Sequence, residues 1–203
     1  MKMICVGRNY VEHAQELGNA VPENPLIFIK PDTALLKDNQ PFYHPDFSDD
    51  IHYECELVFR VSREGKYIQE KFASTYLDGV GLGIDFTARD LQNEAKQKGL
   101  PWTLAKCFNH SAPVSQFLSL DRFPDLQNIH FECRINGETR QIGDSAKMIY
   151  SINYLVSFIS RFITLKKGDY IFTGTPAGVG KINTGDTIQG FLEGEKLLDF
   201  LVK

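Results

Sequence analysis

Alternating side chains in the segment 52–61 constrain the fold more than any other feature of this sequence. Successive side chains of a β-strand point to opposite faces of a sheet, so a period of two predicts a strand with one apolar face. The residues of the apolar face are Tyr53, Cys55, Leu57, Phe59 and Val61. Those of the other face are His52, Glu54, Glu56, Val58 and Arg60. The segment therefore predicts a strand at 53–61 that packs one face against a core.

Short apolar runs predict further strands along the chain. They lie at residues 4–6, 26–29, 80–84, 129–135 and 170–173. Asn136-Gly137 follows one of these runs and is a strong two-residue hairpin turn. A second hairpin is expected through Gly194-Glu195, near the end of the chain. Antiparallel pairing is therefore expected in at least two places.

Three segments carry the signals of a helix. Residues 10–17 form a polar stretch that Gly18-Asn19 would end as a C-cap. Residues 87–90 form a capping-box pattern, which predicts a helix that lasts to about Lys98. Ser151 precedes apolar residues at helical spacing, which predicts a third helix with one apolar face. Strands outnumber helices, so the predicted fold class is α+β and rich in sheet.

Composition limits the classes of protein and of partner. With 203 residues, of which 42% are hydrophobic, the chain is expected to form one domain, residues 1–203, with a substantial core. The net charge of -4 and the scattered Lys and Arg residues argue against a nucleic-acid partner. No apolar stretch is long enough to cross a bilayer, and the N-terminal residues lack the pattern of a secretory signal. We therefore expect no membrane partner and a cytoplasmic location.

Glu54 and Glu56 are spaced i and i+2 on the predicted strand, so both carboxylates point to one face. Unpaired carboxylates at this separation repel each other, and a divalent cation that prefers oxygen ligands would relieve the repulsion. A solvated strand face explains the same spacing and is the more common case. Asp85 ends a glycine-rich strand just before the predicted helix, where it is either a ligand-binding residue or a helix cap.

His13 and Glu16 are spaced i and i+3, so on a helix they share a face and can form a hydrogen bond. A carboxylate that orients an imidazole makes a competent general base, although an exposed helix with accidental pairing gives the same spacing. Lys106 follows an apolar stretch, which predicts partial burial unless its long side chain reaches out to solvent. The glycine-rich segment 173–181 lacks the spacing of a phosphate-binding loop, which excludes ATP and dinucleotide binding.

Five segments, in this order, resemble the fumarylacetoacetate hydrolase superfamily, and within it the small branch of acylpyruvate hydrolases and oxaloacetate decarboxylases. They are C-V-G-R-N-Y at 5–10, E-C-E at 54–56, D-F-T-A-R-D-L-Q at 85–92, G-L-P-W-T-L-A-K at 99–106 and T-G-T-P-A-G-V-G at 173–180. Each segment alone is weak, but together they span nearly the whole chain. The resemblance implies a sheet-rich mixed β-roll with a few short helices, usually assembled as a homodimer.

The resemblance also assigns roles to single residues. The carboxylates that match the ligands of Mg²⁺ or Mn²⁺ in this family are Glu54, Glu56 and Asp85. His13 and Glu16 match a pair that activates water, and Lys106 matches a catalytic lysine. The residues that match contacts to the substrate are Arg8, Tyr10, Lys30, Arg89, Gln92 and Thr175.

The implied reaction is the divalent-metal-dependent cleavage of a C–C bond in a small 2-oxo acid. In it the 2-oxo acid chelates the ion, the His13–Glu16 pair activates water to attack the distal carbonyl, and Lys106 helps to hold the departing enolate. Acylpyruvate hydrolysis and oxaloacetate decarboxylation both fit, and the preferred acyl group and the pathway stay open. Two alternatives remain: a metal-dependent hydratase or isomerase of 2-oxo-enoic acids, or a non-catalytic ligand-binding β domain with a structural ion.

Overall fold

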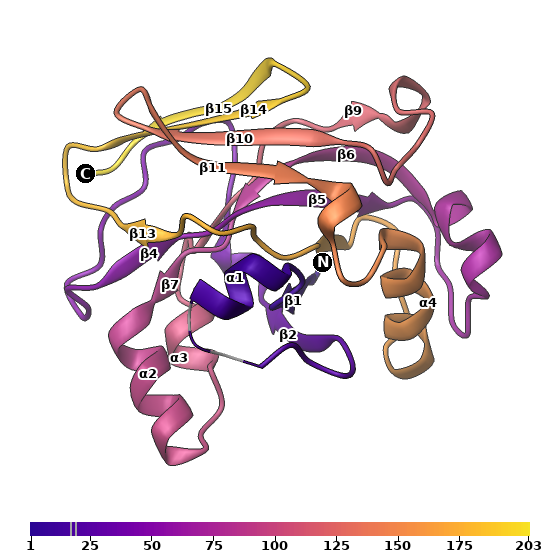
Figure 1. Ribbon diagram of the computed structural model, residues 1–203, viewed down its shortest axis with the longest axis horizontal. Coiled ribbons are helices and arrows are strands. Elements are labelled where there is room, and N and C mark those ends of the chain that lie inside the picture. Colours follow the sequence, from indigo (N-terminus) through magenta and orange to yellow (C-terminus); the bar gives the residue numbers. More distant parts are fainter. Residues whose placement is uncertain (17, 19) are drawn as a thin grey trace.

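A mixed six-stranded sheet forms the framework of the computed structural model, which describes residues 1–16, 18 and 20–203 (Figure 1). The strands, in order across the sheet, are β2 (Leu26–Lys30), β1 (Met3–Gly7), β12 (Tyr170–Phe172), β5 (Cys55–Val61), β6 (Leu77–Ile84) and β9 (Leu118–Ser119). The first and third of these in the chain, β1 and β5, both pair with β12, which comes more than a hundred residues later. β1 runs parallel to β12, and the other neighbours are antiparallel.

A four-stranded antiparallel sheet lies over one face of the large sheet, at the top of Figure 1. Its strands, in order, are β11 (Glu138–Asp144), β10 (His130–Ile135), β14 (Thr187–Leu192) and β15 (Glu195–Leu201). The main core fills the space between the two sheets. It includes Leu57, Phe59, Val80 and Leu82 from the large sheet, and Phe131, Cys133, Ile188 and Leu198 from the smaller one. This pair of facing sheets confirms the predicted sheet-rich α+β class.

Both expected hairpins are present in the four-stranded sheet. Asn136 and Gly137 connect β10 to β11 with φ angles of 54° and 81°, the left-handed conformations that a two-residue turn of type I′ requires. Glu193 and Gly194 connect β14 to β15, also with positive φ angles, so this turn lies one residue before its predicted position.

The predicted strand at 53–61 is divided between two sheets. β4 (Ile51–Tyr53) pairs with β13 (Gly180–Lys181) and β7 (Thr87–Ala88), and β5 begins only after Glu54. β5 is also buried on both faces, because a second apolar cluster covers the face opposite the main core. That cluster contains Met3, Cys5, Ala34, Val58, Ala112, Val114, Tyr170 and Phe172. A separate two-stranded sheet, β3 (Leu35–Leu36) with β8 (Ala112–Pro113), lies beside it.

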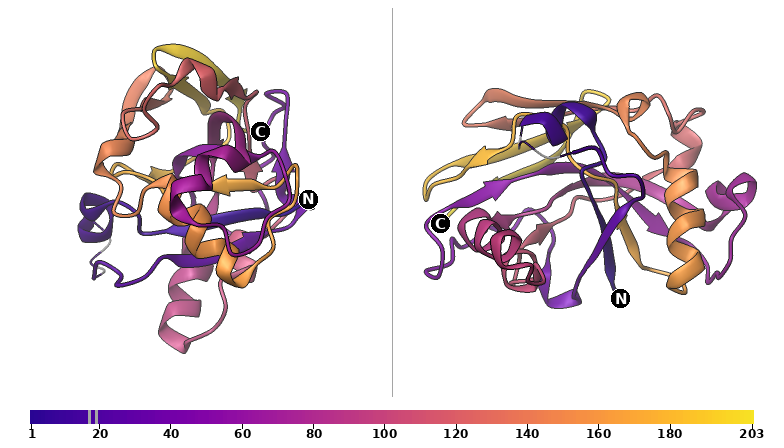
Figure 2. Two further views of the ribbon diagram at one scale, coloured as in Figure 1. Left: turned by 90° about the vertical axis from the view of Figure 1, so that its right-hand side faces the viewer. Right: turned by 60° about the horizontal axis from the view of Figure 1, so that its bottom comes forward.

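The two longest helices, α2 (Arg89–Lys98) and α4 (Ile152–Phe162), lie toward opposite ends of the molecule, and α1 (Val11–Glu16) lies between them (Figures 1 and 2). α3 (Thr103–Lys106) packs against α2. α1 follows β1 directly. The remaining helical turns are the 3-10 segments η1 (Asp32–Ala34), η2 (Glu70–Tyr76), η3 (Leu120–Arg122) and η4 (Ser145–Lys147). Within the described part of the chain, no helix is both long and apolar enough to span a membrane.

The predicted cap at Ser151 is confirmed, and the predicted start of the helix that lasts to Lys98 is wrong. The Ser151 hydroxyl accepts a hydrogen bond from the Tyr154 N–H and caps α4, and Gly99 ends α2 with a φ of 65°. The capping box at 87–90 does not form, because Thr87 belongs to β7 and its hydroxyl donates to the Asp85 carbonyl. Pairing of β7 with β4 thus takes Thr87 away from the start of the helix.

The helix predicted at 10–17 is present as α1, which ends at Glu16. Gly18, the first residue of the predicted C-cap, has a φ of 63°, the left-handed conformation that such a cap requires. Leu17 and Asn19, which the prediction also includes, lie outside the described residues.

Candidate active site

Strand pairing brings the three predicted metal ligands together. Glu54 lies at the break between β4 and β5, Glu56 is the second residue of β5, and Asp85 follows the neighbouring strand β6. The Asp85 N–H donates to the Glu54 carbonyl at 2.8 Å, which fixes the two residues side by side. One oxygen from each carboxylate lies within 4.8 Å of the others, and the three residues are at most 5% exposed. The solvated strand face considered for Glu54 and Glu56 is therefore wrong.

Glu54 and Asp85 share a cationic partner. The Lys106 Nζ donates to Glu54 Oε2 at 2.8 Å and to Asp85 Oδ2 at 2.5 Å, and Arg89 donates to the other oxygen of Glu54. Burial alone would raise the pKa of Glu54, but the positive charges of Lys106 and Arg89 lower it well below its usual range. Glu54 is therefore a charged carboxylate even in this buried position.

Glu56 has a different environment. Its carboxylate accepts a hydrogen bond from the Gly174 N–H at 2.7 Å, and none of the described cations forms an ion pair with it. Burial, together with the negative charges of Asp85 and Glu54, raises the pKa of Glu56 well above its usual range. A buried carboxylate without a cation is unfavourable, and a positive ion beside it would remove the penalty.

Asp85 lies between two lysines. Its Oδ2 accepts a hydrogen bond from Lys106, and its Oδ1 lies 2.9 Å from the Lys30 Nζ, an ion pair without the geometry of a hydrogen bond. The Lys30 ammonium donates to the carbonyls of Phe86, Lys106 and Ser111 and to the Ser111 hydroxyl. Three carboxylates, one of them without a cationic partner among the described residues, are the hard donor set that Mg²⁺ and Mn²⁺ prefer. The triad could therefore hold either ion.

Lys30 has a position that does not favour its predicted contact with a substrate. Its side chain is fully buried, and it lies behind Asp85 rather than on the wall of the pocket described below. Its hydrogen bonds connect the end of α3, the residue after Asp85 and the loop before β8. This arrangement supports the position of Asp85 and of Lys106.

A small cavity of about 30 Å³ opens onto Glu54 and Lys106. This volume accommodates a water molecule or an ion rather than a whole organic acid. The charged or polar side chains on its wall are Arg8, His13, Arg89, Gln92 and Lys96, with Phe28 and Trp102 as aromatic neighbours. Arg89 and Gln92, one turn apart on α2, are joined by a hydrogen bond of 2.6 Å. Five of the predicted site residues besides Glu54 thus lie on this wall.

The predicted dyad lies at the same cavity. His13 Nδ1 is 3.4 Å from Glu16 Oε2, and Glu16 also accepts hydrogen bonds from the Gly178 N–H. His13 is 4% exposed, and this burial lowers its pKa although Glu54 and Glu16 oppose the shift. A lowered pKa keeps the imidazole neutral near pH 7, which is the form that accepts a proton.

Tyr10 and Thr175 are both buried next to the carboxylates. The Tyr10 hydroxyl has no hydrogen-bond partner among the residues that the structure describes. Burial and the negative charge of Glu56 raise the pKa of Tyr10, so its hydroxyl keeps its proton and can donate it. The Thr175 hydroxyl donates to the Cys55 carbonyl at 2.8 Å and accepts a hydrogen bond from Gln141, so it is occupied in holding the start of β5.

Two supporting residues escaped the sequence analysis. Gln141 accepts a hydrogen bond from the Cys55 N–H and donates to Thr175 and to the Pro176 carbonyl, and so joins β5 to the loop after β12. No sequence signal distinguishes this glutamine from others. Gly174 places its N–H on Glu56 with a φ of 94°, and a Cβ there would lie 2.7 Å from the Asn9 Cβ. The sequence did contain a signal for Gly174, because a glycine in a turn often marks a place where two backbone segments approach closely.

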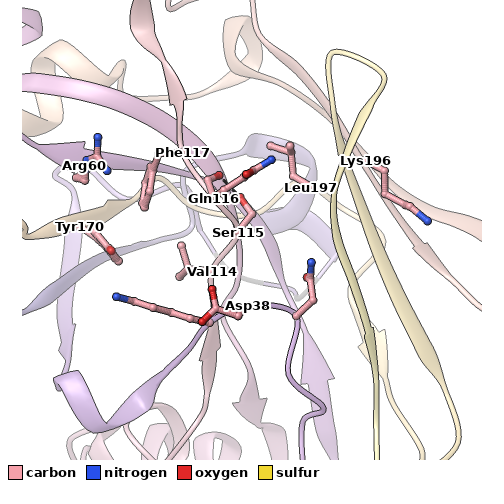
Figure 3. A pocket seen from close by; sticks show the side chains of 11 residues that line it. Asp38, Arg60, Val114, Ser115, Gln116, Phe117, Tyr170, Lys196 and Leu197 are labelled. Carbon is pink, nitrogen blue, oxygen red and sulfur yellow. Dashed lines mark hydrogen bonds between the residues drawn. The ribbon is translucent and has the colours of Figure 1, made fainter.

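A larger cavity, of about 530 Å³, lies apart from the carboxylates (Figure 3). Arg60, Ser115, Gln116, Phe117 and Lys196 are on its wall, and no residue that we predicted for the active site lines it. Arg60 and Lys196 already form ion pairs with Asp78 and Asp199. The chemistry of the side chains, rather than the size of the cavity, therefore identifies the small pocket as the candidate site.

In this sheet-rich α+β fold, three buried carboxylates lie together with a lysine and a histidine–glutamate pair. These features define a class of enzymes whose active site contains several acidic side chains. Residues 2–197 match the family described as Fumarylacetoacetate (FAA) hydrolase C-terminal, and the chain belongs to this family. The resemblance seen in the five sequence segments is thereby confirmed, as is the predicted enzyme class at the level of the family.

Named relatives cover nearly the whole chain. An oxaloacetate tautomerase of Bos taurus is 42% identical over 201 residues, which are 99% of this chain and 91% of the relative. An oxaloacetate decarboxylase of Dictyostelium discoideum is 41% identical and covers 93% of this chain and 87% of its own length. The crystal structure of fumarylpyruvate hydrolase from Pseudomonas aeruginosa, in complex with Mn²⁺ and pyruvate, superposes with a TM-score of 0.94 at 34% identity, over 100% of this chain and 89% of that one.

These relatives also correct one prediction. Both of the oxaloacetate enzymes are named as mitochondrial proteins, so the cytoplasmic location predicted from the sequence is wrong. Ordinary globular composition is common to proteins of both compartments, and it therefore could not decide between them.

Proposed function

We propose that this protein is a divalent-metal-dependent enzyme that cleaves a C–C bond in small 2-oxo acids, by acylpyruvate hydrolysis, oxaloacetate decarboxylation or both. The observation that carries the proposal is the convergence of three buried carboxylates, one of which, Glu56, has no cationic partner among the described residues. The named relatives support it, since they act on oxaloacetate or fumarylpyruvate, and the solved hydrolase contains Mn²⁺ and pyruvate.

Glu54, Glu56 and Asp85 would hold the ion, Mg²⁺ or Mn²⁺. When bound, such an ion stabilises negative charge on the oxygens of a 2-oxo acid. Lys106 adds a fixed positive charge at the same place, because its Nζ contacts both Glu54 and Asp85. Charge that develops on the substrate is therefore met by groups already in position, which is the arrangement that lowers an activation barrier.

His13 is the proposed general base. It is neutral, lies on the wall of the cavity, and contacts Glu16, which the Gly178 N–H holds in place. In hydrolysis, the free ring nitrogen of His13 takes a proton from water as the water attacks the distal carbonyl. Arg89 and Gln92 face the same cavity and are proposed to bind the carboxylate of the substrate.

A second candidate is keto–enol tautomerisation of oxaloacetate, an isomerase reaction. It is favoured by the names of relatives that are about 42% identical over almost the whole chain. The same residues suffice, because His13 would take a proton from C3 and return it to the oxygen on C2, without any cleavage of a C–C bond. The two candidates share an enolate and differ in which bond breaks.

The proposal is tested with purified protein that has been stripped with EDTA and reloaded with Mg²⁺ or Mn²⁺. Acylpyruvates and oxaloacetate are assayed for pyruvate release, carbon dioxide release and keto–enol exchange. We expect turnover that requires metal and is lost in Glu56→Gln but kept in Glu64→Gln, which changes an exposed glutamate paired with Lys166. Full activity after complete chelation, or no turnover of any of these acids, would contradict the proposed function.

A further inference from the structure

The wall of the small cavity carries more positive than negative charge. Four cations line it, Arg8, Arg89, Lys96 and Lys106, against one carboxylate, that of Glu54. Arg89 and Lys106 are already paired with buried carboxylates. Arg8 and Lys96 form no ion pair with any residue that the structure describes, and both are only partly exposed. Two cations on the wall of the cavity thus lack an anionic partner among the described residues.

The position of Lys96 follows from the geometry of α2. Arg89, Gln92 and Lys96 are spaced i, i+3 and i+7, so all three lie on the face of the helix that fronts the cavity. The Lys96 Nζ lies 5.7 Å from the centre of the Trp102 ring, and Trp102 also lines the cavity. Burial and the positive charges of Arg89 and Arg8, which line the same cavity, lower the pKa of Lys96. An anionic ligand would relieve their mutual repulsion.

The position of Arg8 is fixed by a buried turn. Arg8 has a φ of 58°, a left-handed conformation that is uncommon for a residue with a side chain. The fully buried Asn9 next to it donates to the carbonyls of Thr173 and Tyr150 and accepts from the Tyr150 N–H. These hydrogen bonds hold the turn, and an uncommon backbone conformation that the fold maintains is often found at functional sites.

The balance of charge then points to a particular ligand. Three cations balance the charge of the three carboxylates. They are Lys30, Lys106 and Arg89, and each of these cations contacts Glu54 or Asp85. The positive charges of a divalent ion, of Arg8 and of Lys96 are then not neutralised by the protein. A negatively charged substrate would neutralise them. A 2-oxo monocarboxylate supplies one negative charge next to the ion, whereas a 2-oxo dicarboxylate brings a second charge at its other end.

We propose that Lys96 and Arg8 bind the distal carboxylate of a 2-oxo dicarboxylate, and that Lys96 thereby makes the enzyme selective for dicarboxylates over monocarboxylates of similar size. This inference rests on the proposed function, because it assumes that the 2-oxo acid end of the substrate lies at the carboxylate triad. It adds Lys96 to the residues of the site and names the substrate class.

The test compares oxaloacetate with acetylpyruvate, in which a neutral acetyl group replaces the distal carboxylate. Loss of a charge-assisted hydrogen bond should lower kcat/KM of Lys96→Met for oxaloacetate by about tenfold or more, mainly through KM. We expect acetylpyruvate to change by less than about threefold, since it makes no such bond. Lys96→Arg, which keeps the charge, should retain the preference for oxaloacetate. Lys98→Met is the matched control, because Lys98 is on the same helix but is exposed and paired with Glu94.

Two results would overturn the inference alone. Equal losses for both substrates would show that Lys96 supports the site without recognising the distal group, and unchanged kinetics for both would show that it has no role. In either case, metal-dependent turnover of acetylpyruvate by the wild type would leave the proposed function standing. If the wild type with metal turns over neither acid, both the proposed function and this inference are overturned. Circular dichroism of each variant checks that the fold is retained.

Discussion

In the absence of metal, replacement of Glu56 by glutamine should make the folded protein more stable while it abolishes the metal site. Glu56 is 2% exposed, has no cationic partner among the described residues, and lies beside the negative charges of Asp85 and Glu54. Glutamine has nearly the same shape and can still accept the hydrogen bond from the Gly174 N–H. The substitution therefore removes the charge and keeps the packing.

The size of the effect follows from the raised pKa of Glu56. Each unit by which folding raises the pKa of a carboxyl destabilises the charged protein by about 1.4 kcal/mol. The amide N–H groups of the glutamine are also buried, and leaving them without a hydrogen-bond acceptor lowers the stability by about 1 kcal/mol. A net gain of about 1 kcal/mol raises the melting temperature of a chain of this size by roughly 2–4 °C, and a larger shift of the pKa raises it further.

The sign of the pH dependence is fixed by the same shift. A carboxyl whose pKa is raised on folding binds more protons in the folded state than in the unfolded state, so it lowers stability as pH rises above the unfolded value, about 4.3. The advantage of Glu56→Gln over the wild type should therefore be present at pH 7 and shrink as the pH falls toward about 4. Acids far from Glu56 titrate alike in both proteins, so the difference between them reports on Glu56 and on the two carboxylates beside it, Asp85 and Glu54.

The assay is thermal unfolding in EDTA at pH 7 and pH 4.5, followed by the same measurement at pH 7 with Mg²⁺. Metal should stabilise the wild type, by about 2.7 kcal/mol at a hundredfold excess over Kd, and leave the variant unchanged. Glu64→Gln, at an exposed ion pair with Lys166, should behave as the wild type does. A Glu56→Gln protein that is less stable than the wild type in EDTA at pH 7, or that Mg²⁺ stabilises equally, would refute the reasoning.

Four further predictions concern catalysis and assembly. His13→Ala should lower kcat by about 10²–10⁴-fold with little change in melting temperature, and Glu16→Ala should be milder because it orients the base; an unimpaired His13 variant would remove His13 from that role. In the pH profile of kcat/KM, activity should fall as the pH falls through the pKa of His13. Because burial lowers this pKa, the fall should be centred below the ordinary histidine value of about 6.5. A fall centred above that value would point to another group. Oxalate, a planar analogue of pyruvate enolate, should inhibit competitively and more tightly than pyruvate, and only with metal present; inhibition that persists in EDTA would count against the chelation of a 2-oxo acid. The family resemblance predicts a homodimer, which light scattering at several concentrations measures directly as a molar mass near twice 23.0 kDa; a monomer at all concentrations would contradict it.

The sequence by itself determined those features of this protein that depend on a few neighbouring residues. The Asn136-Gly137 turn and the Ser151 cap are of this kind, because a left-handed φ or a side-chain oxygen at a helix start is a local requirement. The α+β class follows in the same way from alternation along single segments. The five segments that resemble one family also predicted a set of site residues, and the structure brings most of them together around Glu54 and Lys106.

The tertiary structure alone decided what surrounds each of those residues. Thr87 carries a correct local signal for a helix cap, but a strand from elsewhere in the chain pairs with it. The Glu54–Glu56 spacing suits a solvated strand equally well. Glu56 is buried because a second apolar cluster covers β5, and Glu54 is buried where it contacts Arg89 of α2 and Lys106 of α3. Burial and long-range pairing depend on residues far away in the chain, so no local pattern contains them.

The charges of the site show this division most clearly. Types and spacings in the sequence pointed to three acids and a lysine, yet they could not show that Lys106 pairs with two of the acids while no described cation pairs with Glu56. Nor could they separate Lys30, buried behind Asp85, from Lys96, which faces the cavity and forms no ion pair with a described residue. The energy of a charge depends on its distance from other charges and from water, and those distances exist only once β5, β6, α2 and α3 have come together.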